Sequence, residues 1–544
     1  MKTISKIFYI ALIAMLFSSY LFSQLAWNYT RINGTGGLAK SSLPSSFPSN
    51  PTSSNYPNII LHPNSNVDQS EMSISSDPSN YSKLLVGGNS VIQTFSPIHY
   101  NQGYYYSTNE GENWNGSDTL PTTGNLSDPA VAYDLNGNAF FAFLKYTGVW
   151  NIAVKKSTNG SSIWGSDVII PNTGDPDKEH LAIDVNSSSP YKNFLYTAWT
   201  DFSISPRVIK FSRSTNGGSN WSSAINISGT SGYSLAQGVC LSVGPTGTLY
   251  ATWAFYDVGS SYENALGFNF STNGGSTWST PSRISINGFS GMRGYLSKGT
   301  VIRIASFPSM DVDTSNGANN GTIYIVWANA GDAINHTNSD IYLVKSSNSG
   351  TTWSNKIKIN NDITTTDQWE PWINVDKYGG INIVFYDSRT DPTNNVLSEI
   401  YMARSIDGGT TISNYLISDY SFTPSMIPNT AYGYMGDYVG ITSTRENAIL
   451  CWNDNRSGVN QAYAAKFDIL LDLAYANKSA SYYATAYNNN HTIERGYSSK
   501  IHEVFHSGGE IFYRRSSNNG TNWQITTRLS SGNGSNDAPS IVAG

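Results

Sequence analysis

Two residue patterns in this sequence could carry chemistry. The run HEVFH at residues 502–506 matches H-E-x-x-H, which on a helix presents two imidazoles to one Zn²⁺ and a Glu to its bound water. In addition, carboxylates and arginines recur at the ends of short apolar runs, as in QWEPWINVD and IVFYDSR. The available chemistry therefore depends on the elements that hold these side chains.

A repeated word organises most of the chain. Its copies are STNEGENW, STNGSSIW, STNGGSNW, STNGGSTW, SSNSGTTW, SIDGGTTI and SSNNGTNW, which begin at Ser107, Ser157, Ser214, Ser271, Ser346, Ser405 and Ser516. In such a word an Asn or Asp side chain bonds its own backbone, Gly allows positive φ, and the following aromatic packs back over the strand. The word therefore predicts a hairpin turn.

Two apolar strand-like runs recur in step with this word. Each module contains three strands, the turn word and a fourth strand, and seven such modules follow one another at roughly 50 to 70 residues each. Four short antiparallel strands at this period predict an all-β fold, a β-propeller whose blades bury their faces on one another. The first and last modules are irregular, as expected where strands from both ends close the ring.

Composition and the N-terminal residues indicate which partners and which cellular compartment to expect. Charged residues make up only 13% of 544, the net charge is -6, and no basic stripe indicates a nucleic-acid partner. Residues 1–23 resemble a secretory signal peptide, with an uncleaved anchor as the alternative, and residues 24–57 form a Ser/Pro/Asn-rich flexible leader. After signal cleavage no membrane-spanning segment is expected. Cys240 and Cys451 lie in apolar runs and are expected to be buried thiols, not a disulfide.

The period breaks after Phe467 and resumes at KIHEVFH. We therefore expect a propeller over residues 58–468, then a linker and the first blade of an incomplete second propeller over 469–544, in a sequence that is a fragment of a longer product. An eighth blade of one ring is the alternative.

The repeated word resembles S-x-D-x-G-x-x-W, the Asp-box or bacterial neuraminidase (BNR) repeat of the sialidase superfamily. Six copies carry Asn at the third position and Asp407 is the exception, but Asn can make the same turn bond. The resemblance implies a sialidase-like propeller. Sialidases usually have six blades, so seven modules depart from the family; seven blades are favoured and six stay open.

The propeller places informative residues at two sets of positions. Asp257, Asp387, Arg389, Asp454 and Arg456 stand at tips of the second strands, and the starts of the first strands carry Glu71, Asp128, Asp177, Glu179, Glu370, Asp437 and Tyr438. Both sets are expected on the face opposite the turn words. They predict one concave, acid-rich mouth at the centre of that face.

The resemblance also implies catalytic roles. Sialidases use three arginines on the sugar carboxylate, a Tyr nucleophile with a Glu partner, and an Asp acid/base. The candidates are Tyr438 as nucleophile, Glu370 or Glu179 as its partner, and Asp437 as a further catalytic carboxylate. The ligand-binding candidates are Arg389 and Arg456 as clamp arginines, with Asp387, Asp454 and Glu71.

The sequence departs from the enzymes at one diagnostic place. No Arg-Ile-Pro word occurs, and residues 58–121 contain no Arg; Arg303 in VIRIAS is the nearest substitute. Alternatively, the Asp and Arg of the DSR and DNR words form ion pairs that tie a loop to its neighbour. Glu179 and Glu370 would then accept hydrogen bonds from backbone N–H groups or form hydrogen bonds between blades.

Two functions therefore stay open. The first is a secreted or cell-surface module that binds extracellular glycan or a surface protein; the second is an exo-sialidase or related glycoside hydrolase. No cofactor or metal site is expected, although loop oxygens leave Ca²⁺ open. Aligned with the repeat, HEVFH is a second strand of a blade. His502 and His506 then lie about 13 Å apart at the strand rise, too far to share a zinc ion.

Overall fold

The computed structural model describes residues 56–64, 66–93, 99–332, 337–469, 493–495, 501–507, 510–516 and 527–528. The chain divides into two compact units, Met1–Phe467 and Asp468–Gly544. The predicted signal peptide and nearly all of the predicted leader lie outside the described residues. In the part of the chain that the structure describes, no helix has the length and apolar character needed to cross a bilayer.

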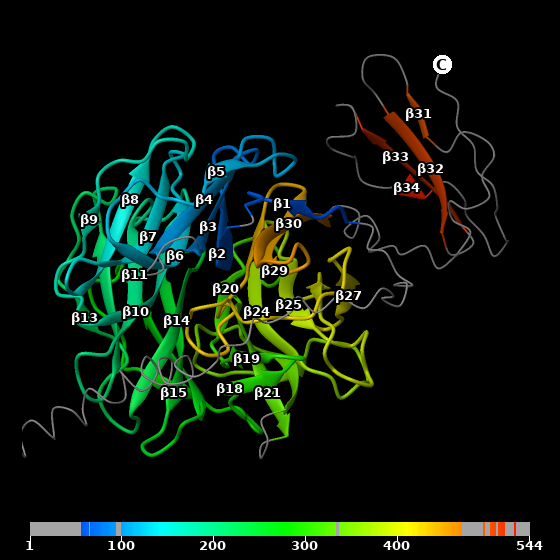
Figure 1. Cartoon of the computed structure of the whole chain (residues 1–544). Coiled ribbons are helices and arrows are strands. Elements are labelled where there is room, and N and C mark those ends of the chain that lie inside the picture. The colour runs from blue at the N-terminus through cyan, green and yellow to red at the C-terminus, as the bar shows by residue number, and fades with distance from the viewer. Residues whose placement is uncertain are drawn as a thin grey trace, which may run out of the picture. The chain divides into compact units, whose positions relative to one another are not determined.

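The first unit contains seven four-stranded antiparallel sheets, which form the blades of a β-propeller (Figure 1). We name the strands of each blade A to D from the axis outward. The A strands contact one another in a closed ring in the order β2, β6, β10, β14, β20, β24, β28 and back to β2. The predicted all-β propeller with seven blades is therefore confirmed.

Six blades follow chain order. Blade 1 contains β2 (Val67–Ser76), β3 (Leu84–Ile92), β4 (His99–Ser107) and β5 (Asn115–Ser117). Blade 2 contains β6 (Asn125–Tyr133), β7 (Ala139–Tyr146), β8 (Trp150–Ser157) and β9 (Val168–Ile169). Blade 3 contains β10 (Pro176–Ile183), β11 (Leu195–Asp201), β12 (Val208–Ser214) and β13 (Ile225–Asn226).

The next three blades repeat this order. Blade 4 contains β14 (Leu235–Val243), β15 (Leu249–Tyr256), β16 (Ala265–Ser271) and β17 (Ser282–Ile284). After the hairpin of β18 (Gly294–Ser297) and β19 (Val301–Ile304), blade 5 contains β20 (Ser309–Val312), β21 (Ile323–Asp332), β22 (Thr337–Ser346) and β23 (Ile357–Lys358). Blade 6 contains β24 (Gln368–Val375), β25 (Ile381–Asp387), β26 (Glu399–Ser405) and β27 (Ser413–Leu416).

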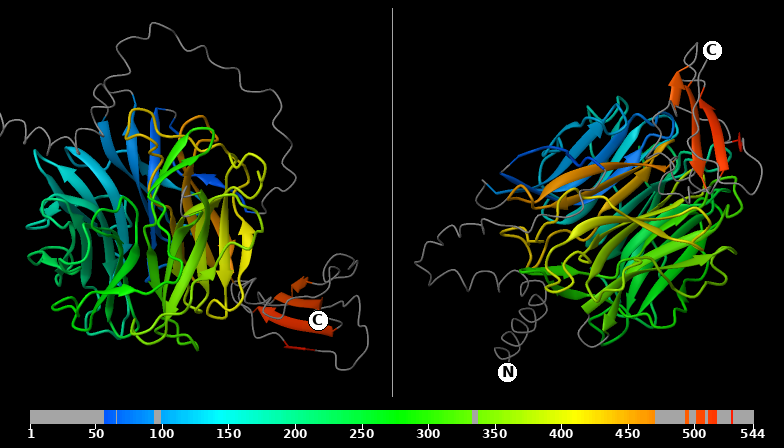
Figure 2. Two further views of the ribbon diagram at one scale, coloured as in Figure 1. Left: turned by 90° about the horizontal axis from the view of Figure 1, so that it is seen from below. Right: turned by 90° about the vertical axis from the view of Figure 1, so that its right-hand side faces the viewer.

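Blade 7 closes the ring with strands from both ends of the unit. It contains β28 (Gly440–Ser443), β29 (Asn447–Asp454), β30 (Gln461–Asp468) and, as its outer strand, β1 (Ile59–Ile60). Ile59 pairs with Ala464 and Ile60 with Tyr463. In Figure 2 the blue strands of blade 1 lie beside the orange strands of blade 7, in agreement with the contact between β2 and β29.

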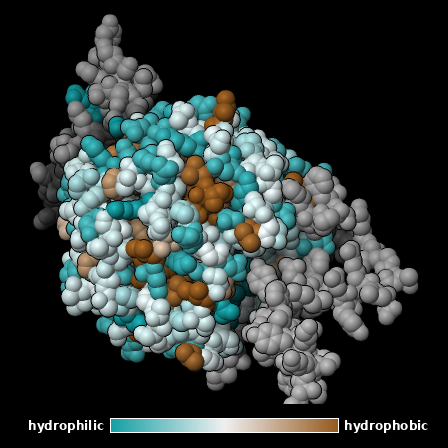
Figure 3. All heavy atoms as spheres, turned by 90° about the vertical axis from the view of Figure 1, so that its left-hand side faces the viewer, coloured by the Kyte–Doolittle hydropathy of each residue, from teal (hydrophilic) through white to brown (hydrophobic). Residues whose placement is uncertain are grey.

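Aromatic side chains on the B strands hold the blades together. Trp199, Trp253, Trp327 and Trp452 each lie in a B strand with no exposed surface. Replacing such a buried Trp with Ala typically costs about 3 to 5 kcal/mol. The aromatic word that ends each predicted second strand therefore supplies the packing between blades. On the flank of the molecule that carries β9 and β13, exposed hydrophobic residues occur in separate patches among hydrophilic ones (Figure 3).

The repeated word forms the same hydrogen-bonded turn between strands C and D in six blades. In the fourth copy, Ser271 Oγ donates to Asn273 Oδ1 (3.0 Å), Gly275 N donates to Ser271 Oγ (2.9 Å), and Thr277 N donates to Asn273 Oδ1 (2.9 Å). Asp407 accepts the equivalent bonds from Ser405 Oγ and Thr411 N. Asn therefore does close this turn as Asp does. All but the first residue of the copy at 516–523 lies outside the described residues.

The described residues of the second unit include a four-stranded antiparallel sheet of β31 (Ile493–Arg495), β32 (Ile501–Ser507), β33 (Glu510–Ser516) and β34 (Thr527–Arg528). HEVFH lies in β32, as the repeat alignment predicted, so the motif is on a strand and not on a helix. The interpretation of this sheet as the start of a second propeller stays a prediction.

Candidate functional site

Five A strands carry a β-bulge near their first residues. The strand register shifts there in β2, β6, β10, β14 and β24. The residue that opens each bulge has a positive φ, and these residues are Glu71 (58°), Asp128 (54°), Lys178 (51°), Gly238 (70°) and Glu370 (50°). Positive φ is uncommon for residues other than Gly, and bulges re-aim side chains near functional sites. Here the bulges bring charged side chains together at one end of the propeller axis.

We call this group the axial cluster. It contains Glu71, Asp128, Asp177, Lys178, Glu179, Arg303, Glu370 and Asp437. At its centre, Lys178 Nζ lies 3.1 Å from Asp437 Oδ2 and 3.6 Å from Glu71 Oε1. Arg303 donates to both oxygens of Asp437, from Nη2 (2.7 Å) and from Nε (3.2 Å). The cations of the cluster are therefore already paired with the chain's own carboxylates.

Burial and charge divide these carboxyl groups into two kinds. Burial alone would raise the pKa of Asp437, but the charges of Arg303 and Lys178 hold that pKa well below its usual value. Burial raises the pKa of Glu71 to about 8, against the opposing charge of Lys178. Burial, with the nearby charge of Asp128, also raises the pKa of Glu179 well above its usual range. Asp437 is thus an ionised anchor, whereas Glu71 and Glu179 favour the protonated form near neutral pH.

Two carboxyl groups of the cluster have oxygen atoms without a hydrogen-bond partner among the described residues. They are both oxygens of Glu179, whose residue is 5% exposed, and Oε1 of Glu370, whose residue is 6% exposed. Burial and the charge of Asp437 raise the pKa of Glu370 well above its usual range. Buried polar atoms without partners are rare in folded proteins and are candidates for ligand contact.

Both residues line a cavity of about 860 Å³ along the propeller axis, which we call the funnel. Residues of all seven A strands form its wall. Its exposed lining residues, Val185, Ser187, Ser188, Thr246, Thr314, Asn316, Asn320 and Lys377, lie in turns between A and B strands or at the strand ends that lead into them. At the other end, Lys178, Glu179 and Glu370 are buried. The funnel therefore opens on the face that carries the repeated turns and ends blind on the axial cluster.

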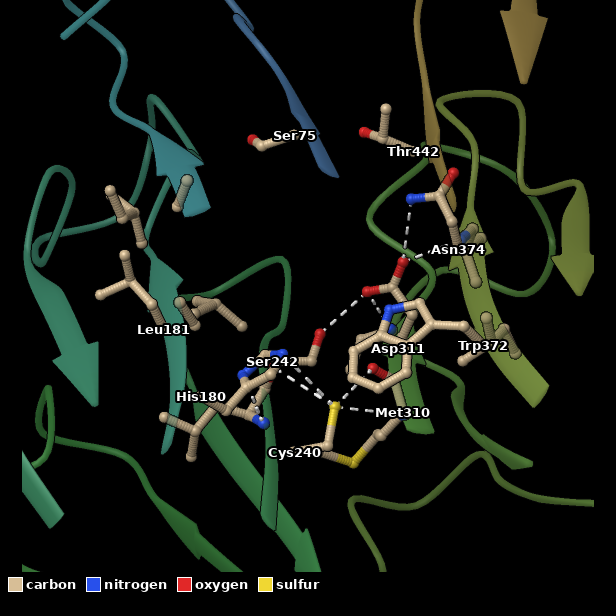
Figure 4. Close-up of a pocket in the computed structure, with 18 of the residues that line it drawn as sticks. Ser75, His180, Leu181, Cys240, Ser242, Met310, Asp311, Trp372, Asn374 and Thr442 are labelled. Carbon is tan, nitrogen blue, oxygen red and sulfur yellow. Dashed lines mark hydrogen bonds between the residues drawn. The ribbon is translucent and has the colours of Figure 1, made fainter. Parts of the chain in front are cut away.

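The funnel wall has an apolar side and a polar side. In Figure 4, Leu181 lies across the space from Asp311, Asn374 and Trp372. Asp311 accepts hydrogen bonds from Ser242 Oγ (2.9 Å) and Val375 N (2.7 Å), which belong to the blades on either side, and burial raises its pKa to about 6. Asp311 thus joins three blades while it faces the funnel.

A buried His–Cys pair lies in the same wall (Figure 4). Nδ1 of His180 accepts a hydrogen bond from Leu241 N (3.2 Å), and burial lowers the pKa of His180 to about 4. Cys240 Sγ lies 3.9 Å from His180 Nε2, and burial raises the pKa of this thiol to about 12. His180 is therefore neutral and Cys240 is a protonated thiol. Both cysteines are free and buried, as the sequence predicted.

The hairpin of β18 and β19 closes the blind end. It follows blade 4 in the chain, yet Lys298 Nζ bonds Asp367 Oδ2 (2.9 Å) and Asn395 Oδ1 (2.7 Å), which flank strands of blade 6. Arg303 N donates to Gly433 O (2.7 Å), just before blade 7. The hairpin therefore crosses this face and carries Arg303 to Asp437.

Tyr438, the predicted nucleophile, lies at the same end of the funnel. Its hydroxyl donates to the backbone oxygen of Pro129 (3.1 Å), and its ring lies 4.7 Å from Lys178 Nζ and 5.9 Å from the Trp372 ring. Burial, reinforced by Glu71, raises the pKa of this phenol well above its usual value. The phenol proton is thus held by a backbone carbonyl and not by a carboxylate.

The structure brings together part of the predicted site. All seven residues predicted at the starts of the first strands meet there: Glu71, Asp128, Asp177, Glu179, Glu370, Asp437 and Tyr438. The predicted position of the opening is wrong. The sequence predicted a mouth on the face opposite the turn words, whereas the funnel opens on the face that carries them. The crossing hairpin closes the face opposite the turn words, so the cavity opens on the other face.

The predicted clamp arginines do not join this group. Arg389 Nη2 pairs with Asp387 Oδ2 (2.7 Å) and also donates to Asn414 Oδ1 of strand D (3.0 Å). The guanidinium group of Arg389 stacks on the ring of Tyr401 in strand C. In blade 7, Arg456 Nη2 pairs with Asp454 Oδ2 (2.7 Å), and the guanidinium stacks on Tyr463 of strand C. Arg389 also bonds Asn361, between blades 5 and 6, and Arg456 also pairs with Asp419, between blades 6 and 7. Both arginines therefore tie loops to neighbouring segments, as the alternative hypothesis for DSR and DNR predicts.

Sequence reasoning did not single out Lys178, the central cation. Lys178 stands between Asp177 and Glu179 in DKEH. A basic residue between two acids at the start of a strand could have indicated that its ammonium group pairs with carboxylates at the axis. Arg303 was noted only as a distant substitute. Among the residues that the structure describes, no three His, Cys, Asp or Glu side chains gather as a metal site requires.

Comparison with known proteins gives structural neighbours only. No protein-family model matches this sequence, and no curated protein matches it. The chain is similar to a structure of unknown function from Dyadobacter fermentans (14% identity over 61% of this chain and 93% of that chain, TM-score 0.43). It is also similar to an intramolecular trans-sialidase from Ruminococcus gnavus (14% identity over 63% of this chain and 95% of that chain, TM-score 0.41). A third similar structure is an α-L-arabinofuranosidase of Fusarium graminearum (12% identity over 76% of this chain and 98% of that chain, TM-score 0.42). Sialidases, to which the sequence already pointed, are thus among its neighbours, and the likeness concerns the propeller fold.

Proposed function

We propose that this chain is a non-catalytic propeller that binds the end of an extracellular carbohydrate chain in its central funnel. The observation that carries the proposal is the buried, unpartnered carboxyl group of Glu179 at the blind end of an 860 Å³ cavity. A pocket of this size is in the range that holds small ligands. A blind funnel admits the terminus of a chain and not its middle.

The chemistry of the funnel suits a sugar. Sugars combine apolar C–H faces with hydroxyl groups, and the funnel combines apolar residues such as Leu181 with polar residues such as Asn374 and Ser75. A protonated Glu179 both donates and accepts hydrogen bonds. A hydroxyl group of the ligand would therefore satisfy oxygen atoms that have no partner in the free chain.

Two features favour binding over hydrolysis. The Tyr438 hydroxyl donates to Pro129 O, and no carboxylate of the described residues accepts a hydrogen bond from it. Asp437, paired with both Arg303 and Lys178, is an ionised anchor and a poor proton donor. We further propose that the protein acts outside the cell, on the basis of the signal-like residues 1–23.

Calorimetric titration with a panel of neutral, acidic and amino oligosaccharides tests the proposal. Ser75 is half-buried and lines the funnel, so Ser75→Phe is expected to abolish binding of any member that titrates. Ser223→Phe, on the exposed surface of blade 3, is the matched control and should leave binding unchanged.

The same panel as fluorogenic glycosides separates the two functions. No turnover is expected for the wild-type chain. Turnover that disappears in Tyr438→Phe or Glu370→Gln would replace the binding function with a glycoside hydrolase, and failure of every glycan to titrate would reject the proposed function.

A further inference from the structure

We propose that the funnel selects carbohydrate ends that carry a free amine, such as de-N-acetylated amino sugars, over neutral and acidic ones. This inference rests on the proposed carbohydrate-binding function and names its ligand class. It is argued from the charges, the unpaired carboxyl groups and the aromatic rings of the blind end.

The charges of the blind end are unequal. The axial cluster contains six carboxyl groups, those of Glu71, Asp128, Asp177, Glu179, Glu370 and Asp437, and two basic groups. The basic groups, Lys178 and Arg303, are both paired with Asp437, and the positive charge of Arg293 also acts on this carboxylate. The carboxyl groups of the cluster therefore outnumber its basic groups, and both basic groups are already paired, which favours a cationic ligand over an anionic one.

The unpartnered atoms are of one kind. Both oxygens of Glu179 and Oε1 of Glu370 belong to buried carboxyl groups of residues that line the funnel, and each is an acceptor once its carboxyl group is ionised. Leaving a buried polar atom unsatisfied is unfavourable, so a ligand that satisfies these atoms gains affinity. An ammonium group has three donors and no acceptor, so it can donate to these carboxyl groups in their ionised form.

The chain already holds one ammonium group at this end in the manner proposed for the ligand. Lys178 Nζ lies between the carboxyl groups of Asp437 and Glu71 and the faces of Tyr438 (4.7 Å) and Phe307 (5.3 Å). The faces of aromatic rings attract cations, the more so when the cation is desolvated. Trp372, which packs against Tyr438, supplies a further ring on the funnel wall.

Binding of an amine is linked to proton release. In the free chain burial raises the pKa of Glu179 well above its usual range, which favours the protonated form. When R–NH₃⁺ enters, the carboxyl O–H bond breaks, the carboxylate pairs with the ammonium group, and the proton leaves to the buffer. Since the free carboxyl has the higher pKa, affinity rises with pH until the carboxyl group is ionised in the free chain or the amine loses its own proton.

Other charged groups face these two carboxyl groups and set the size of the linkage. Around Glu179 the packed elements contribute Asp128, Asp177, Glu71, Lys178 and Tyr438, with the neutral His180 next in the chain. Around Glu370 they contribute Asp437, Lys178, Glu71, Arg303 and Tyr386. Most of these groups are acids, so they reinforce the preference for a cation.

Titration of the full chain with the glucosamine trimer and with its fully N-acetylated counterpart tests the inference, because the two differ in charge and share a sugar backbone. At pH 7 the amine trimer is expected to bind at least about tenfold more tightly, the equivalent of one charge-assisted hydrogen bond. Repeating the titration in two buffers of different ionisation enthalpy should show net proton release. Glu179→Gln should remove most of the difference between the two trimers, whereas Glu112→Gln, an exposed acid on a turn word, should not.

The outcomes separate the inference from the function on which it rests. Equal binding of both trimers, abolished by Ser75→Phe, would overturn the amine preference and leave the carbohydrate site standing. Tighter binding of sialyllactose would also overturn the preference. Failure of all three to bind would reject the amine preference, and failure of the whole oligosaccharide panel would reject the carbohydrate site as well. Trilysine bound as tightly as the glucosamine trimer would overturn the assignment to carbohydrate. If Glu179→Gln fails to fold, Glu370→Gln provides the same comparison.

Discussion

At the scale of single residues, Lys178 is the residue on which the axial cluster depends. Its ammonium group lies 3.1 Å from Asp437 and 3.6 Å from Glu71, and its own backbone lies at a bulge with a φ of 51°. Its backbone N–H also donates to Asp128 Oδ2 (3.0 Å). One side chain and one N–H thus link acids from blades 1, 2 and 7 to blade 3.

Lys178→Met is expected to lower the free energy of unfolding by about 1.5 to 3 kcal/mol, because it removes one of the two cations that pair with the buried, ionised carboxylate of Asp437. Arg303 remains on Asp437, so that carboxylate is not left without a cation. Urea unfolding followed by Trp fluorescence measures the change. Lys192→Met, at an exposed position, is the control and should shift stability by less than about 0.5 kcal/mol. A loss below 1 kcal/mol for Lys178→Met would contradict this role.

Individual residues of the site were only partly predictable from the sequence. The sequence correctly predicted acids of the axial cluster, because a polar residue at the start of the first strand of a blade lies next to the propeller axis. Among these acids are Glu71, Glu179, Glu370 and Asp437. Arg389 was assigned to the ligand because its type suits a carboxylate. Whether an Arg at a strand tip turns inward or outward depends on its neighbours, and here Tyr401 and Asn414 hold it outward.

At the scale of elements, the repeated turn has the same hydrogen bonds whether Asn or Asp occupies its third position. In the third copy, Asn216 Oδ1 accepts hydrogen bonds from Ser214 Oγ (3.0 Å) and Asn220 N (3.0 Å), and neither bond uses the Asn side-chain nitrogen, Nδ2. The same geometry occurs with Asp407. Sequence alone therefore predicted this element correctly, since all the bonds that define it are local.

Asn216→Asp is consequently expected to change stability by less than about 0.5 kcal/mol, whereas Asn216→Ala should cost about 1 kcal/mol per lost hydrogen bond. Thermal unfolding of the two variants side by side makes the comparison. Equal losses in both would mean that the amide nitrogen, and not Oδ1, stabilises the turn.

The hairpin of β18 and β19 is the element that sequence reasoning underestimated. Its residues fall between two modules and have no counterpart in the repeat, so the period says nothing about where they go. The contacts that place it are long-range ones, from Lys298 to Asp367 and from Arg303 to Asp437. These contacts close the face where the mouth was expected, which is why the position of the opening could not be predicted.

At the scale of the whole molecule, the sequence predicted the architecture better than the site. Seven modules predicted seven blades because each blade is a local meander and each needs only its two neighbours. Ring closure was expected from the irregular first and last modules, and the pairing of Ile59 with Ala464 is the form it takes. The funnel, in contrast, depends on how seven A strands meet at the axis, and no single module contains that information.

The ring closure itself should limit the stability of the first unit. Leu61, just after β1, is 3% exposed, and its N–H donates to Ala462 O (2.9 Å). Leu61→Pro removes that donor and the buried side chain, so we expect a loss of about 2 to 4 kcal/mol and an open edge on β30. Leu61→Met keeps both the N–H and the volume and should cost less than about 1.5 kcal/mol.

Hydrogen exchange locates this effect. In Leu61→Pro the amides of β30 should lose protection first, because β1 is the one strand that pairs with the outer side of β30, while the amides of β10 in blade 3 should keep theirs. Protection lost equally in β30 and β10 would mean that the ring unfolds as one cooperative unit. Unchanged protection of β30 would mean that β1 does not hold the ring closed, and that the contacts between the A strands β28 and β2 are sufficient for closure.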